Sequence, residues 1–95
     1  MWVIWTKPAA NSLATIQDYI AKDNPPAAYN ITQKIYHSVS QLTNHPELGR
    51  VGRVKDTHEL IVPGLPFIVP YRIKDKEIQI LAVYHTSRKW PESFD

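Results

Sequence analysis

The segment PFIVPYRI, residues 66–73, predicts a β-strand. Its side chains form two alternating sets, one wholly apolar and one that includes a cation: Phe67, Val69, Tyr71 and Ile73 against Ile68, Pro70 and Arg72. This period of two is typical of a β-strand. Proline donates no ladder hydrogen bond and belongs at an edge or a bulge. We therefore expect a local irregularity of the sheet at Pro70.

Two more strands are predicted on either side of this segment. THELIV, residues 57–62, precedes it across a PGLP turn, and EIQILAVYH, residues 77–85, follows it across a short KDK turn. Short turns of this kind join antiparallel neighbours. The C-terminal half is therefore predicted to be an antiparallel meander with 66–73 as its middle strand.

The N-terminal half predicts one strand and two helices. WVIW, residues 2–5, is β-branched and aromatic, and Thr6 can cap a helix with Pro8 in its first turn. Apolar residues then recur at helical spacing along two segments, which end at KDNPP (22–26) and by Pro46: Ala9, Leu13, Ile16 and Ile20, then Ala28, Ile31, Ile35, Val39 and Leu42. Their very short connection makes the two helices an antiparallel αα-hairpin. The order βααβββ predicts a single α+β domain over residues 1–95, with the N-terminal strand and the helical hairpin packed on an antiparallel sheet.

The composition limits the classes of function. The chain has 95 residues, no cysteine and a formal net charge of +2. The lack of cysteine excludes disulfides and thiolate metal sites, as is usual for cytoplasmic proteins, and we find neither a signal-peptide pattern nor a membrane span. The four histidines lack ligand spacing, and no Walker-type, GxGxxG or GxSxG motif is present. We therefore expect no metal and no cofactor.

Basic side chains are concentrated in the C-terminal half of the chain. Eight of the eleven lysines and arginines lie between Arg50 and Lys89. The segment PELGRVGRVKD, residues 46–56, has no periodicity, and we expect a loop that is free to move. Its cations Arg50, Arg53 and Lys55 surround two glycines, where guanidinium and backbone N–H groups can meet phosphates or carboxylates. A solvated surface loop gives the same pattern without any function.

Further residues can extend this basic surface. Arg72 lies on the middle predicted strand, and Arg88, Lys89 and Trp90 follow the last one. Trp90 can stack on a base or on a partner side chain, although a tryptophan near a C-terminus also serves as the lid of a small core. The candidate target-binding residues are thus Arg50, Arg53, Lys55, Arg72, Arg88, Lys89 and Trp90.

Three segments together resemble the RelE/ParE superfamily of bacterial type II toxins: DYIAKDNPPAA (18–28), HPELGRVGRVKDTHELIVPGLPFIVPYRI (45–73) and ILAVYHTSRKWP (80–91). The resemblance covers nearly the whole chain and implies the same βααβββ order. It also implies a small cytoplasmic protein that arrests growth, is held inactive by a co-expressed antitoxin, and reaches operator DNA only through that antitoxin. In this superfamily the RelE branch cuts mRNA in the ribosomal A site, and the ParE branch is described as poisoning DNA gyrase.

The two branches require different side chains. RNA cleavage through the 2′-OH needs a base, a cation on the scissile phosphate and an acid for the leaving oxygen. The resemblance implies that RelE-like nucleases carry this cation as the arginine of an R-L-V-Y type motif on the middle strand. With Tyr71 setting the register, that position holds Ile68, which cannot bind phosphate. If the chain were a nuclease nonetheless, the candidate catalytic residues would be His85, Tyr84 and Arg72.

We therefore expect a ParE-like toxin that acts by binding, with DNA gyrase as its target. The segments DYIAKDNPPAA and FIVPYRI favour this branch, whereas His58 stands where relatives commonly carry arginine. The alternative is a RelE-like, ribosome-dependent mRNA endonuclease. A third possibility is a family member that binds only its antitoxin and, with it, operator DNA.

Overall fold

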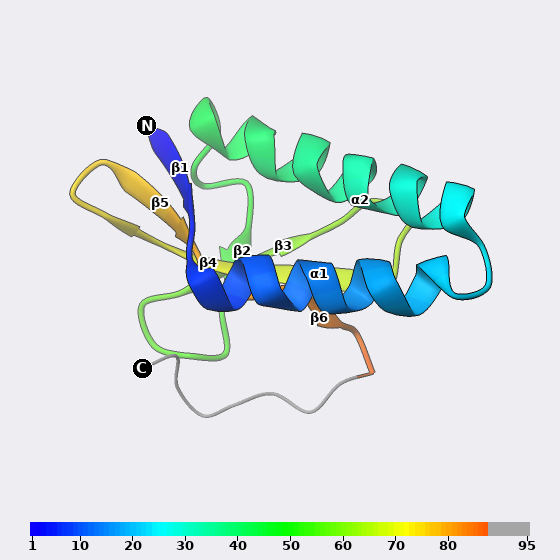
Figure 1. Ribbon diagram of the computed structural model, residues 1–95. Helices are drawn as coiled ribbons and strands as arrows, with labels where there is room; N and C mark the ends of the chain where they lie inside the picture. The colour runs from blue at the N-terminus through cyan, green and yellow to red at the C-terminus, as the bar shows by residue number, and fades with distance from the viewer. Residues whose placement is uncertain (88–95) are drawn as a thin grey trace.

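The computed structural model describes residues 1–87, which form a six-stranded sheet with two helices on one face (Figure 1). The elements in chain order are β1 (Trp2–Trp5), α1 (Lys7–Ala21), α2 (Pro25–Ser40), the 3₁₀-helix η1 (Gln41–Thr43), β2 (Arg50–Val51), β3 (His58–Ile61), β4 (Phe67–Lys74), β5 (Glu77–Ile80) and β6 (Tyr84–His85). The predicted α+β class and the succession of one strand, two helices and then strands are confirmed.

The helices begin at the predicted caps. Thr6 Oγ1 accepts a hydrogen bond from the backbone N–H of Ala9 (3.4 Å), and Asn24 Oδ1 accepts one from Ala27 (3.1 Å). Prolines occupy the first turn of each helix, where backbone N–H groups make no intrahelical hydrogen bond, so the missing N–H of proline costs the helix nothing there. Figure 1 shows α1 and α2 side by side as the predicted antiparallel hairpin. Within residues 1–87, no helix combines the length and the apolar character needed to cross a membrane.

The sheet is mixed in strand direction. Its spatial order is β1-β5-β4-β3-β2, and β6 pairs with β4. The predicted meander of β3, β4 and β5 is antiparallel, whereas β1 joins it as a parallel neighbour of β5. The prediction of an antiparallel sheet is therefore correct for the meander and wrong for its edge. The helical hairpin and three strands lie between β1 and β5 in the chain, so no tight turn requires these two strands to run antiparallel.

The core lies between the helices and the sheet. Its buried members are Ala9, Leu13, Ile35, Val39, Leu42, Leu60, Val62, Phe67, Val69, Tyr71, Ile78, Ile80 and Val83. They include inward residues of both helical stripes and three members of the apolar set predicted for the middle strand. Tyr71 is the largest side chain among those that are fully buried. A hydroxyl at this depth requires hydrogen-bond partners, because an unpaired buried polar group is destabilising.

The last predicted strand is interrupted by a bulge opposite Pro70. The β4–β5 ladder reaches Tyr71 opposite Ile80, and the β4–β6 ladder resumes with Ile68 opposite Tyr84. Between these pairs, two residues of β4 face three residues, 81–83, of the other strand. Pro70 accepts a hydrogen bond from the N–H of Leu81 (2.9 Å) but has no N–H to return. The expected irregularity at Pro70 is confirmed, and the prediction of one continuous strand over 77–85 is wrong.

This bulge decides which way the residues of β6 face. Directly opposite residues lie on the same face of a sheet. His85 is opposite Phe67 and therefore on the helix-covered face, whereas Tyr84 is opposite Ile68 on the other face. Without the additional residue, Tyr84 would take the position opposite Phe67.

Candidate functional site

The basic loop is fixed at its start by the buried hydroxyl of Tyr71. This hydroxyl donates a hydrogen bond to the carbonyl of Pro46 (2.7 Å) and accepts one from the N–H of Gly49 (2.9 Å). A Cβ on Gly49 would lie 2.6 Å from Cε1 of Tyr71, so that no larger residue fits without a shift. Burial raises the pKa of Tyr71, and the nearby Glu47 carboxylate adds to this rise although the Gly49 hydrogen bond opposes it.

A second anchor is the buried carboxylate of Glu59 on β3. Its side chain is 2% exposed, and Oε1 accepts hydrogen bonds from Arg50 Nε (3.1 Å) and Nη2 (3.0 Å). Its Oε2 accepts a hydrogen bond from the backbone N–H of Arg53 (2.9 Å), whose Nε lies 4.0 Å away. Charge-assisted bonds of this kind are about twice as strong as neutral ones, and they hold both arginines at one carboxylate.

Together these anchors show that the prediction of a freely moving loop is wrong. The loop also contains β2, which pairs with β3 through Arg50 opposite Glu59, and it closes with a hydrogen bond from Gly52 N–H to the carbonyl of Thr57 (2.8 Å). Sequence reasoning missed Glu59. The signal was present as a single acidic residue in the strand THELIV, four residues after the last cation of the loop.

The strand register places two of the candidate cations, Arg50 and Arg72, on the same face of the sheet. Arg50 is opposite Glu59, Glu59 is opposite Pro70, and Arg72 lies two residues further along β4, so all project from the sheet face that the helices leave uncovered. Arg72 is exposed, and its Nε donates to Gln79 Oε1 (2.6 Å). Lys55 is exposed on the same loop as Arg50 and Arg53. The predicted proximity of Arg72 to the loop is thus consistent with the register, while Arg88, Lys89 and Trp90 lie outside the described residues.

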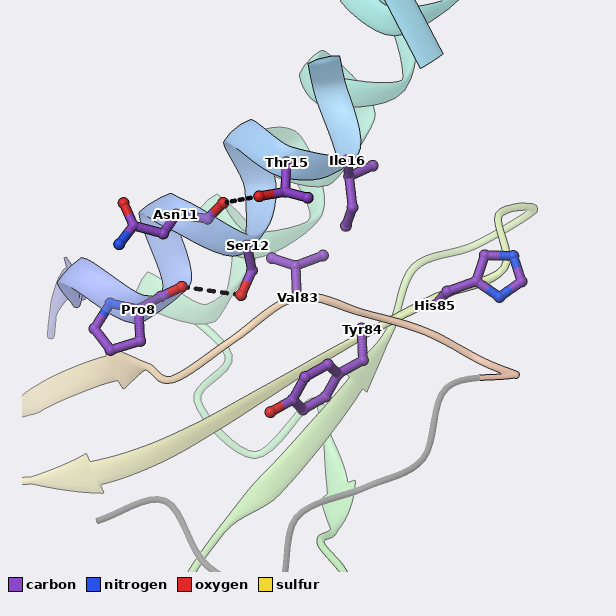
Figure 2. Close-up of a pocket in the computed structure, with 8 residues that line it drawn as sticks. All are labelled: Pro8, Asn11, Ser12, Thr15, Ile16, Val83, Tyr84 and His85. Carbon is purple, nitrogen blue, oxygen red and sulfur yellow. Dashed lines mark hydrogen bonds between the residues drawn. The ribbon is translucent and has the colours of Figure 1, made fainter. Parts of the chain in front are cut away.

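At the other candidate position, β6 borders a groove beneath α1. This groove has a volume of about 280 Å³ and is lined by Pro8, Asn11, Ser12, Thr15, Ile16, Val83, Tyr84 and His85. Figure 2 shows that the Tyr84 side chain points away from α1 and that the His85 ring lies further along the strand. The two side chains therefore do not converge on one point of the groove.

The hydrogen bonds of His85 determine which ring nitrogen carries the proton. Nδ1 accepts a hydrogen bond from the backbone N–H of Ser87 (3.2 Å) and lies 2.8 Å from Ser87 Oγ. A backbone N–H can only donate, so the neutral ring is protonated at Nε2. In this arrangement Nε2 has no lone pair with which to act as a base. The ring edge packs against Phe67, with 5.6 Å between ring centroids.

The position that the resemblance aligns with the arginine of RelE-like nucleases is apolar. Ile68 is 4% exposed and lies opposite Tyr84. Arg72 lies on the same face, but four residues along a strand separate the two by about 13 Å. The three residues considered for catalysis, His85, Tyr84 and Arg72, are thus not assembled around a reacting phosphate. No group of side chains that could hold a metal ion occurs within residues 1–87.

Comparison with known proteins decides the family. The family described as "ParE toxin of type II toxin-antitoxin system, parDE" matches residues 3–90. The chain belongs to the ParE toxin family. This confirms the resemblance seen in the three sequence segments, and it makes the protein a ParE-family toxin of a type II toxin–antitoxin system.

Individual relatives of this ParE-family toxin agree in length and fold. The chain is 41% identical to the Sinorhizobium fredii protein Y4kP over 88 residues, which cover 93% of this chain and 91% of the relative. It is 29% identical to Toxin RelE2 of Caulobacter vibrioides, covering 90% and 96% of the two chains. A solved structure, the chromosomal ParDE TA system from P. aeruginosa, is similar with a TM-score of 0.82 and 33% identity, covering 90% of this chain and 95% of the other.

Proposed function

We propose that this ParE-family toxin arrests growth in the cytoplasm by binding a cellular target, DNA gyrase, without cutting RNA itself. The observation that carries the proposal is the apolar Ile68 opposite Tyr84, in the place where cleavage of RNA requires a cation. Loss of one transition-state donor lowers a rate by about 10²–10³.

We further propose that the loop cations Arg50, Arg53 and Lys55 form the target-binding surface, with Arg72 beside them. The arginine side chains are 51% and 54% exposed although both are held at Glu59. A side chain that is already ordered loses less conformational entropy on binding than a free one. The anchored loop therefore presents its cations in a fixed arrangement to an acidic or phosphate-bearing surface. The candidates Arg88, Lys89 and Trp90 remain part of this proposal.

The cognate antitoxin is proposed to neutralise the toxin by folding on its surface and to be its only link to operator DNA. The P. aeruginosa relative is described as a ParDE system, a toxin with its antitoxin. Large hydrophobic side chains are exposed on the helices, on the strands and on the loop before β2: Trp2, Ile4, Tyr19, Tyr29, Tyr36, Leu48, Val51 and Ile61. Covering such surface with a segment that orders on binding needs an interface larger than the ~1,600 Å² of a standard complex.

Expression without the antitoxin, with separate labelling of new DNA and new protein, tests the target. We expect DNA synthesis to stop first and DNA-damage signalling to rise, and we expect purified gyrase to accumulate cleaved DNA in the presence of the toxin. Early arrest of translation with cut transcripts would instead support the ribosome-dependent endonuclease. A normal growth rate would support a protein that binds only its antitoxin.

A further inference from the structure

The strand β1 leaves one side of its backbone unpaired at the edge of the sheet (Figure 1). In the described part of the chain, β1 pairs with β5 and with no other strand. The N–H groups of Trp2 and Thr6 donate to carbonyl groups of the segment 76–80 (3.2 Å each), so these residues direct their backbone groups at β5. Because such directions alternate along a strand, Val3 and Trp5 direct their N–H and C=O groups at the open edge.

This edge lacks the features that usually prevent strands from pairing with other molecules. Native edge strands are commonly protected by a charged side chain, a proline or a bulge. The strand WVIW has no charged residue and no proline, and its ladder to β5 is continuous. Trp2 and Ile4 are 76% and 42% exposed. Ile4 is opposite Gln79, which is opposite Arg72, so both exposed side chains lie on the face of the sheet that the helices leave uncovered.

The helix-covered side of the same edge is aromatic as well. Trp5 is opposite Ile80, a residue of the core, and therefore lies on the side of the helices. Its ring packs on Tyr36 of α2, with 5.1 Å between ring centroids, and Tyr36 is 46% exposed. A partner strand along β1 would thus find apolar side chains on both sides of the open backbone groups.

The two outward-facing residues are placed symmetrically about Ile4, which suits a second copy of the same strand. In an antiparallel pair, residues that exchange both hydrogen bonds must both face the partner. Val3 opposite Trp5 of a second copy meets this condition, and the symmetry repeats the pair, so the two pairs together make four hydrogen bonds. Ile4 then lies opposite Ile4 of the second copy. A shift by one residue would place outward-facing residues opposite residues that are bonded to β5.

We propose that this toxin forms a two-fold symmetric dimer in which β1 pairs antiparallel with β1 of a second copy and the two sheets become one. The two-fold axis is perpendicular to the joined sheet. The helices of both copies therefore lie on one side, and the two uncovered faces, each with Arg50 and Arg72, lie together on the other. The inference concerns the toxin alone and does not depend on its target.

The size of this contact makes the expected dimer weak. Aromatic side chains bury about 150–250 Å² each, so Trp2 and Tyr36 of both copies supply roughly half of the ~1,000 Å² that a specific interface needs. The strand backbones and Ile4 supply the rest. Interfaces of this size are typical of transient complexes, and we expect a dissociation constant of about 1–100 µM.

A single cysteine at position 4 tests the pairing and its register. The chain has no cysteine, so Ile4→Cys introduces the only thiol. The Cα atoms of such a directly opposite, non-hydrogen-bonded pair are about 4.5 Å apart, within the usual range for a disulfide. We expect oxidised glutathione to convert Ile4→Cys into a covalent dimer at least about tenfold faster than Ile61→Cys. Ile61 is the matched control, because it is 49% exposed on the same face at the far side of the sheet. Equal rates of dimer formation would overturn the proposal.

A charge at the same two positions tests the free dimer without a covalent bond. Ile4→Lys places two like charges directly opposite each other, whereas Ile61→Lys adds the same charge outside the interface. Sedimentation at about 200 µM should show a monomer for Ile4→Lys and the same dimer fraction as wild type for Ile61→Lys. A wild-type protein that remains monomeric at this concentration, or two variants that dimerise equally, would contradict a dimer through β1.

Hydrogen exchange on the unmodified toxin tests the backbone bonds. Raising the toxin concentration from about 1 µM to about 500 µM should protect the amides of Val3 and Trp5 at least about fivefold more. The Thr6 amide, which already donates to Ile80, should exchange at the same rate at both concentrations. Protection of Val3 and Trp5 that does not change with concentration would refute the proposal. Protection that appears only when the antitoxin is added would refute it too, and would assign this edge to the antitoxin.

Discussion

Replacing Tyr71 by phenylalanine should detach the basic loop from the sheet and destabilise the whole domain. The substitution keeps the ring in the core and removes the hydroxyl that bonds Pro46 and Gly49. Gly49 is buried, so its N–H loses its partner without gaining water. An unpaired buried polar group costs about 1–3 kcal/mol, and we expect the free energy of unfolding to fall by about 2–4 kcal/mol. In a domain of this size the melting temperature should fall by at least about 8 °C.

Urea unfolding of the purified toxin measures this loss, and Tyr36→Phe is the matched control. Tyr36 also packs on an aromatic ring, Trp5, with 5.1 Å between centroids, but it is 46% exposed. Removing its hydroxyl should change the free energy of unfolding by less than about 0.5 kcal/mol. Equal stabilities of the two variants would refute the conclusion that Tyr71 anchors the loop.

Urea unfolding of the wild type and of Tyr71→Phe at several pH values tests the titration of Tyr71. Burial raises its pKa above the usual value of 10.0, so the folded state favours the protonated hydroxyl. Stability from this group is fully present below pH 10 and is lost as pH rises towards the folded-state pKa. The stability difference between the wild type and Tyr71→Phe should therefore shrink above pH 10. A difference that stays constant to higher pH would show that the hydroxyl is not buried in solution.

The remaining predictions concern the carboxylate anchor, the loop surface and catalysis. Glu59→Leu removes the acceptor of Arg50 Nε and Nη2 and of the Arg53 backbone N–H, and it should lower the free energy of unfolding by about 1–3 kcal/mol; the double variant Arg50→Leu, Glu59→Leu should recover only part of that loss in the same urea titration, because the acceptor of the Arg53 N–H is still missing. Lys55→Glu should relieve growth arrest while changing the melting temperature little, since an exposed charge contributes little to folding; full toxicity with an unchanged target affinity would remove Lys55 from the target-binding surface. Purified toxin should not cleave mRNA on programmed ribosomes, and cleavage products that disappear in His85→Ala would show that the nuclease assignment was wrongly rejected.

The elements of this fold could be predicted from the sequence because each one has a local signal. The helices have caps at Thr6 and Asn24 with an apolar stripe of period 3.6, and the strands are β-branched and aromatic runs between proline-rich or charged turns. Pro70 even indicated the irregularity, since its missing N–H is a property of one residue. These signals depend only on neighbours along the chain.

The features that could not be predicted depend on contacts between distant segments. The pairing of β1 with β5 joins residues more than 70 positions apart, and nothing in WVIW specifies that partner. The role of Glu59 follows from its burial between β2 and β4, because a glutamate in an amphipathic strand reads equally well as a solvated one. The loop appeared mobile for the same reason. Its anchors are side chains of β3 and β4, and they are visible only once those strands lie beside it.

The bulge at residues 81–83 bears on how any relative of this protein should be compared with it. A relative that lacks the additional residue would carry its strand-end pair in the opposite sense, with the first residue under the helix and the second on the uncovered face. Two chains could then share the same tyrosine and histidine, aligned across a one-residue gap, and still present different chemistry to a partner. Conversely, a single insertion or deletion between Ile80 and Tyr84 could change which of the two strand-end side chains lies on the uncovered face of the sheet, without any substitution. Within this family, strand-end residues are therefore equivalent only when the length of the preceding bulge is also the same.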